Sequence, residues 1–281
     1  MPWKLYIDSR KRVKGARGDS DSSFAIQLPY PITVSGKCYI DVVLLSNNYY
    51  TIRANDNDRI YLDEMAAQTK RVVTIAPGRY TIFELRDALV AALNNARGTT
   101  GQYAIVYLQT VDRFQISLVN SVAADQFRIW SEAYMETHWE EWSGVTSLSA
   151  NNLGSANRPC GFSSGGLIAG AHTVVTTAPN APDVQPYNQL FIRSSLASNE
   201  SLGVNGESDI VRRIVIGNTP QGSVVHDVHS QIFDCITIAG KPEISQMWFE
   251  LIDIHGKIVN THGLPVSFSV FFKMSTNKKM N

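Results

Sequence analysis

Two histidines, His226 and His229, are the only close pair of histidines in the sequence. They lie three positions apart, and side chains at that spacing in a β-strand point to opposite faces. A shared metal ion would therefore need a bulge or turn between them, and the His-x-His spacing of a cupin-type strand is absent. We expect no metal site. A cupin-like or hydrolytic enzyme would require both histidines to converge with a carboxylate.

Signatures of nucleophilic and phosphate chemistry are also missing. The sequence has no Gly-x-Ser-x-Gly elbow, and its three cysteines lie far apart without a recognisable motif. The glycine-rich stretch 161–170 lacks the Gly-Lys-Ser/Thr that holds phosphate. The adjacent carboxylates Asp63-Glu64 and Glu140-Glu141 are typical of solvated acids. We therefore predict no catalytic residues and no cofactor, and we expect that the protein is not an enzyme.

An aromatic cluster offers a different kind of site. Trp139 and Trp142 lie close in sequence to Trp130 and Tyr134. Such side chains are enriched in protein interfaces and on sugar-binding surfaces. They also form the local core of an insertion, which is the interpretation that we favour. Exposed rings at Trp139 and Trp142 would instead indicate a receptor- or carbohydrate-binding module.

Basic side chains are concentrated near the N-terminus, at Arg10, Lys11, Arg12, Lys14 and Arg17. Residues 1–21 are therefore expected to form a flexible basic arm, although the alternation in Trp3–Asp8 is typical of a short strand. The arm would contact an acidic partner or packaged nucleic acid, or would simply be solvated. If it is such an arm, deleting the residues before Asp21 should leave the fold intact.

The tripeptide Arg17-Gly18-Asp19 lies within this segment and spells the integrin-binding motif. A chain of this length contains it by chance on the order of a few per cent of the time, and an arm directed to the interior of an assembly would hide it. Receptor binding through it is therefore a minor hypothesis.

Composition limits the classes of partner. Charged residues make up 18% of the 281-residue chain, below the roughly 25% of an average soluble protein, and the net charge is zero. This balance disfavours binding of nucleic acid through electrostatic attraction by the whole domain. It fits a surface covered by neighbouring subunits, or one rich in uncharged polar loops. No apolar run reaches the 18 residues of a membrane span.

Short β-branched and aromatic runs recur along most of the chain and predict strands. They fall at 24–28, 38–45, 59–63, 71–75, 103–108, 113–119, 189–193, 210–216, 235–238, 247–254 and 266–273. The run 38–45 is almost continuously apolar, so we expect a strand buried on both faces. One short helix is expected over about 81–95, because Thr81 and Glu84 form a capping box before leucines at helical spacing.

Many strands with one helix favour a mainly β fold, and specifically a single jelly-roll sandwich. We expect this domain to span 22–274, with a loop-rich insertion over about 131–186 and a polar C-terminal tail at 275–281. The insertion is inferred because that region is dense in Ser, Asn, Gly, Ala and Pro.

Several short motifs, taken in order, resemble the small capsid proteins of polinton-like viruses and virophages. They are Tyr6-Ile7-Asp8-Ser9-Arg10, Phe24-Ala25-Ile26-Gln27-Leu28, Ile40-Asp41-Val42-Val43-Leu44, Asn48-Tyr49-Tyr50, Pro77-Gly78-Arg79-Tyr80-Thr81 with Glu84-Leu85, Phe191-Ile192-Arg193-Ser194-Ser195-Leu196, Phe249-Glu250-Leu251-Ile252-Asp253 and Val266-Ser267-Phe268-Ser269-Val270. The region 131–186 has no counterpart in the resemblance.

The resemblance implies a penton, or minor capsid, protein of the double-jelly-roll virus lineage. It implies a homopentamer at the icosahedral vertices, in contact with double-jelly-roll trimers of the major capsid protein and with other minor capsid proteins. It places the protein in the virion, assembled in the host cytoplasm or nucleus. The alternative that we keep open is a jelly-roll spike or attachment module that binds a receptor or carbohydrate.

Overall fold

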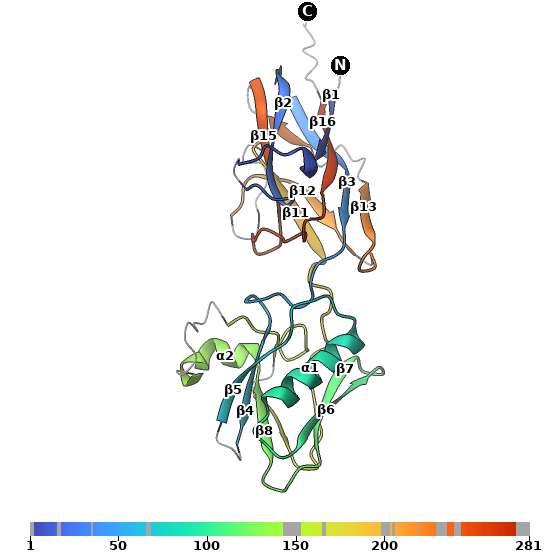
Figure 1. Cartoon of the computed structure of the whole chain (residues 1–281). Helices are drawn as coiled ribbons and strands as arrows, with labels where there is room; N and C mark the ends of the chain where they lie inside the picture. Colours follow the sequence, from blue (N-terminus) through green and yellow to red (C-terminus); the bar gives the residue numbers. More distant parts are fainter. Residues whose placement is uncertain are drawn as a thin grey trace, which may run out of the picture. The chain divides into compact units, whose positions relative to one another are not determined.

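The computed structural model describes residues 3–15, 18–34, 36–65, 69–142, 153–164, 167–197, 203, 206–217, 219–228, 235–238 and 243–273. The chain divides into two compact units (Figure 1). Unit 1 joins Met1–Tyr49 with Tyr187–Asn281, and unit 2 is Tyr50–Pro186. Unit 2 is therefore inserted in the chain between the two parts of unit 1. Within the described ranges, no helix has the length and apolar character needed to cross a membrane.

Unit 1 contains two antiparallel sheets. The first contains, in spatial order, β1 (Trp3–Asp8), β16 (Ser267–Lys273), β3 (Gly36–Ser46) and β13 (Val224–Val228), with β14 (Ile236–Ile238) paired further along β3. The second contains β12 (Ile210–Val215), β11 (Gln189–Ser194), β15 (Glu243–Ile252) and β2 (Ser23–Thr33). Figure 1 shows strands from the two ends of the chain side by side in both sheets.

The strand pairing of unit 1 is that of a jelly roll. The first strand pairs with the last, β1 with β16, and the second with the next to last, β2 with β15. Strand β3 pairs with β13 and β14, and β11 pairs with β12. A two-stranded ribbon folded over in this way distributes its strands between two facing sheets. The predicted mainly β fold with a single jelly roll is confirmed.

The two sheets of unit 1 bury one common apolar core. At its centre, Phe24 from β2, Phe249 from β15 and Phe268 from β16 lie with ring centroids 4.9 to 6.4 Å apart. Aromatic rings at these separations and tilted to one another pack favourably beyond the area that they bury. Side chains from both ends of the chain therefore close the sandwich.

Strand β3 is not buried on both faces, and that prediction is wrong. Along it, buried Cys38 and Ile40 alternate with partly exposed Tyr39 and Asp41. The inner side of β3 faces the core, while no second layer of unit 1 covers its outer side in the described residues. Tyrosine, valine and leucine on that outer side made the sequence look continuously buried.

Unit 2 contains two further antiparallel sheets and the helices. One sheet has the order β5 (Thr69–Thr74), β4 (Arg59–Glu64), β8 (Gln126–Trp130) and β9 (Leu167–Ala171), and the other has β10 (Thr176–Thr177), β7 (Arg113–Val119) and β6 (Gln102–Leu108). Helix α1 (Ile82–Ala96) buries Leu85, Leu89 and Leu93 in a core shared with both sheets. Helix α2 (Glu132–His138) and the 3-10 turn η2 (Trp139–Trp142) follow β8.

The predicted helix and its N-terminal signal are confirmed by α1. The Thr81 hydroxyl accepts a hydrogen bond from the Glu84 backbone N–H at 3.3 Å, and a Glu84 carboxylate oxygen accepts one from the Thr81 N–H at 2.8 Å. These two reciprocal bonds satisfy backbone donors that a helix start otherwise leaves unpaired. Helix α2 lies where the sequence indicated only irregular structure.

The expected insertion at 131–186 is the later part of a larger unit that begins at Tyr50. Residues 59–130 belong with it because β4 pairs with β8 and β8 with β9. Strands of the two units have the same composition, so the sequence did not show which strands share a sheet. The tail expected at 275–281 lies outside the described residues.

Candidate interaction surfaces

The N-terminal segment, expected to be a flexible arm, contains an ordered strand. Residues of β1 pair with β16 from Trp3 opposite Phe272 to Asp8 opposite Ser267. The Ile7 side chain is buried in the core of unit 1. The short 3-10 turn η1 (Ser9–Lys11) follows directly. The structure therefore differs from the expected arm over residues 3–11, because the pairing strand β16 lies far away in the sequence.

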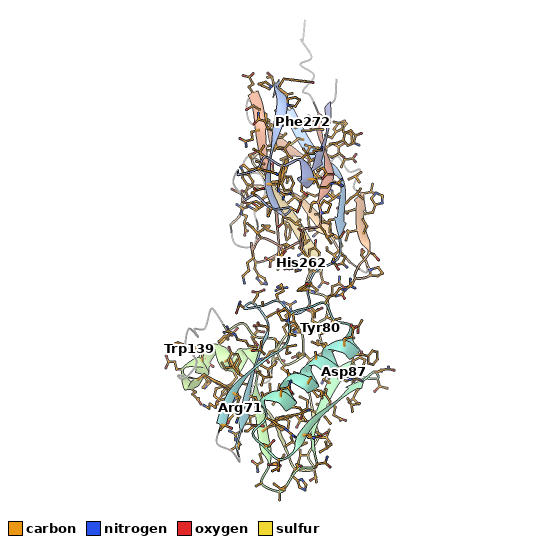
Figure 2. All side chains as sticks on the ribbon, in the orientation of Figure 1. Arg71, Tyr80, Asp87, Trp139, His262 and Phe272 are labelled. Carbon is orange, nitrogen blue, oxygen red and sulfur yellow. The ribbon has the colours of Figure 1, made fainter. Side chains whose placement is uncertain are left out.

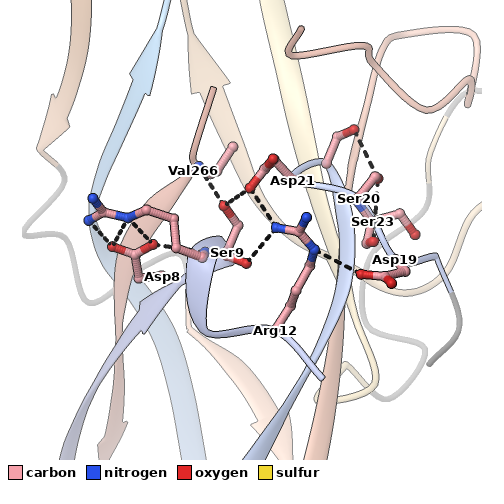
Figure 3. Close-up of polar contacts among 10 residues, drawn as sticks. Asp8, Ser9, Arg12, Asp19, Ser20, Asp21, Ser23 and Val266 are labelled. Carbon is pink, nitrogen blue, oxygen red and sulfur yellow. Dashed lines mark hydrogen bonds and ion pairs between the residues drawn. The ribbon is translucent and has the colours of Figure 1, made fainter. Parts of the chain in front are cut away.

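Ser9 joins this segment to the rest of unit 1 (Figure 3). Its backbone N–H donates to the Val266 carbonyl at 3.0 Å, and its hydroxyl accepts from the Val266 N–H at 3.1 Å. The same hydroxyl donates to Asp21 at 2.7 Å. Because Ser9 is fully buried, these bonds satisfy polar groups that would otherwise be costly to remove from water.

Two of the basic side chains are held by nearby carboxylates. Arg10 forms an ion pair with Asp8, and its hydrogen bonds lower the pKa of that carboxyl below the ordinary value. Arg12 bonds both Asp19 and Asp21 at 2.9 Å. Lys11 and Lys14 are exposed. A good part of the basic charge in this segment therefore organises the chain locally.

The Arg17-Gly18-Asp19 motif is only partly described. Arg17 lies outside the described residues, and Gly18 has a left-handed backbone with φ of 67°. The Asp19 carboxylate accepts from the Gly15 backbone N–H at 3.1 Å and from Arg12, and these contacts lower its pKa. An integrin-type contact through Asp19 would compete with both partners for the carboxylate.

We predict that removing residues 1–8 destabilises the protein, contrary to the expectation from sequence. Loss of β1 exposes the core around Ile7, which alone corresponds to about 2 kcal/mol of apolar burial. Urea unfolding followed by circular dichroism measures the change. The double variant K11A/K14A is the control, because it removes two exposed charges and keeps β1. Equal stability of the truncated and full-length chains would restore the flexible-arm interpretation.

The aromatic cluster is mostly interior to unit 2. Trp142 is 3% exposed and packs edge-on against Trp130 and Tyr61, with ring centroids 5.3 and 5.1 Å apart. Trp139 is half-buried against the same small core, at the end of α2 (Figure 2). The Lys70 ammonium lies 4.6 Å from the Trp130 ring centroid, a cation–π contact. The ring of Trp142 is thus not presented to a ligand.

The part of the chain that the structure describes contains no candidate metal site. Three or more histidine, cysteine, aspartate or glutamate side chains nowhere cluster there as metal ligands. His226 lies exposed on β13, and His229 lies outside the described residues.

The sequence reasoning missed one surface, the outward side of the β1-β16-β3-β13 sheet, which we call the outer face. Strand register places Tyr6 opposite Ser269 and Val42 opposite Val228 on it, together with a row of Ser267, Leu44 and His226 across three strands. A groove of about 350 Å³ lies in this face, lined by Lys4, Tyr6, Ile7, Asp8, Val42, Leu44, Ser267, Phe268 and Ser269. The alternation in Trp3–Asp8 signalled that Tyr6 points away from the core.

Comparison with known proteins shows a likeness to a solved structure. No protein-family profile matches this sequence, and no curated protein sequence matches it. Among solved structures, the crystal structure of the mavirus penton protein is similar, with 10% sequence identity and a TM-score of 0.51. The match covers 97% of this chain and 99% of that chain. The chain has a penton-like jelly-roll fold. At this identity the likeness shows the fold alone.

Proposed function

We propose that this chain is a structural capsid protein that forms the pentameric vertex of an icosahedral virus. The observation that carries the proposal is the match to the mavirus penton protein over nearly the full length of both chains, units 1 and 2 included. The order of sequence motifs, which resembles small capsid proteins of polinton-like viruses and virophages, supports it independently. The function requires assembly surfaces and no catalytic residue.

The proposal implies a location in the virion and a set of neighbours. These are four further copies of the chain, trimers of a double-jelly-roll major capsid protein and other minor capsid proteins. The low charge fraction supports extensive protein contacts, because charged residues are depleted at the centres of interfaces. Any contact between the N-terminal segment and nucleic acid is weak in this proposal, because Arg10 and Arg12 are already paired.

The native mass of the purified protein tests the proposal. Five subunits of 31.1 kDa form a closed ring of about 155 kDa, which we expect from light scattering or native mass spectrometry. A stable trimer of about 93 kDa would contradict the vertex proposal and support a spike. A monomer at every concentration tested would contradict assembly by this chain alone.

The attachment-module alternative has less support from the site. It predicts exposed aromatic rings at Trp139 and Trp142, and Trp142 is instead packed inside unit 2. Glycan binding without a pentamer would nevertheless favour that alternative.

A further inference from the structure

The outer face gathers exposed apolar side chains. Tyr6 is 78% exposed, Leu44 41%, Val224 60% and Val228 54%. In unit 1, the other large apolar side chains that are similarly exposed are scattered at Tyr30, Val215, Ile254 and Ile258. Contiguous apolar side chains on a sheet surface mark an interaction site, whereas single ones do not.

The aromatic contacts of the outer face extend this apolar area. Tyr39 and Phe271 lie directly opposite each other on β3 and β16, and their ring centroids are 5.0 Å apart. Both side chains are partly exposed. Aromatic residues of this kind are enriched at the centres of protein interfaces.

The acids on the outer face that lie near its apolar rows have basic partners. Asp41 lies 2.7 Å from Lys4, and Asp8 is paired with Arg10. A carboxylate that is already paired and hydrogen-bonded loses less on leaving water than an isolated one. Lys37 and His226 are further titratable side chains on the described part of this face. The acids nearest the apolar rows of the face are therefore paired, and these rows carry little net charge.

The groove gives the face a shape that a protein surface can fill. Its floor includes the small side chains Ser267 and Ser269, between Tyr6 on one side and Leu44 on the other. Opposite Ser269, strand β3 has an irregular register, with Val43 pairing Phe268 and Ile40 pairing Val270. Such a bulge bends the strand locally, so the face is not flat.

We infer that the outer face packs against a neighbouring copy of this chain in the pentamer. The inference rests on the proposed function, because a closed ring requires two different lateral surfaces on every subunit. A second copy fits because the chain has no net charge, so copies do not repel one another overall. Apolar rows with little net charge also suit a lasting protein contact better than an anionic ligand.

The area of the face agrees with this role. Four strands spaced about 4.8 Å apart and about 20 Å long cover roughly 400 Å² as a flat surface. Side chains that project from this surface add to the area that a partner can bury. A standard interface buries about 800 Å² on each partner. The outer face is thus large enough for the centre of a contact, and surrounding loops would complete it.

Charge substitutions on the outer face test the inference. L44R and V228R each place a guanidinium within the proposed contact, on β3 and on the edge strand β13, without touching the core. We expect either change to raise the protein concentration needed for half-assembly by about 100-fold or more. V106R is the matched control, since Val106 is 55% exposed on β6 of unit 2. Circular dichroism and thermal unfolding establish that each variant is folded.

The outcomes separate this inference from the proposed function. If wild type and V106R form pentamers while L44R and V228R are folded but dissociated, both the vertex proposal and the inference are supported. If wild type, L44R and V228R are all pentameric, the vertex proposal stands and the outer face is not the subunit contact. If those two variants form pentamers but fail to enter particles, the face binds another capsid component and the inference is wrong. A monomeric wild-type chain overturns the pentamer and this contact together.

Discussion

Replacing Phe249 by alanine is expected to lower the free energy of unfolding by about 3–5 kcal/mol, the usual range for a buried phenylalanine. Phe249 is almost fully buried and packs against both Phe24 and Phe268 at the centre of unit 1. Its removal leaves a cavity between the two sheets that the β ladders cannot close. Urea unfolding measures the loss, and pentamer formation should fall with it because both sheets depend on this core.

The control for this variant is F83A, which removes the same ring from an exposed position. Phe83 is 47% exposed on α1 and contacts Tyr107 and Arg86 at the surface. We expect F83A to cost less than about 1 kcal/mol. If F249A were no more destabilising than F83A, Phe249 would not close the sandwich as described.

Replacing Asp227 by alanine is expected to cost roughly 3 kcal/mol, because it removes the carboxylate from a buried guanidinium. The Arg212 side chain is 3% exposed and donates to Asp227 from two nitrogens, at 2.6 and 3.2 Å. Arg212 lies on β12 and Asp227 on β13, so this ion pair connects the two sheets of the sandwich. Thermal and urea unfolding of D227A measure the effect.

Two control variants distinguish the loss of the buried ion pair from the general effect of removing a charged side chain. D87A removes an exposed carboxylate that pairs with Arg86 and should change stability by less than about 1 kcal/mol. The double variant R212M/D227L removes both buried charges and should recover most of the loss. An unaltered stability of D227A would mean that other contacts of Arg212 suffice.

The same ion pair explains why the sequence pattern did not predict strand β13. In Val224–Val228 the inward positions hold Val225 and Asp227, while valines at both ends point outward. Asp227 inward and valines outward break the usual alternation, in which apolar side chains face the core and polar ones face solvent. Asp227 can face inward only because Arg212 meets it, and Arg212 comes from a different sheet. A local pattern contains no information on that partner.

The candidate interaction surfaces could likewise not be predicted from local sequence patterns. The charges of Arg10 and Arg12 are evident in the sequence, but their pairing with Asp8, Asp19 and Asp21 depends on how the chain turns between β1 and β2. Trp142 is a buried core residue because the elements of unit 2 close around it. The outer face exists because strands from both ends of the chain and from its middle share one sheet.

Features that depend on neighbouring residues could be predicted from the sequence. These are the mainly β composition, most strand positions and helix α1, whose capping box forms between residues three apart. Only the tertiary structure decided which strands pair, where unit 2 begins and which apolar side chains remain exposed. Strands β1 and β16 lie at opposite ends of the chain, yet they form one ladder. Strand pairing is fixed by the burial of the whole core, and strands of similar composition satisfy the same local pattern in either unit.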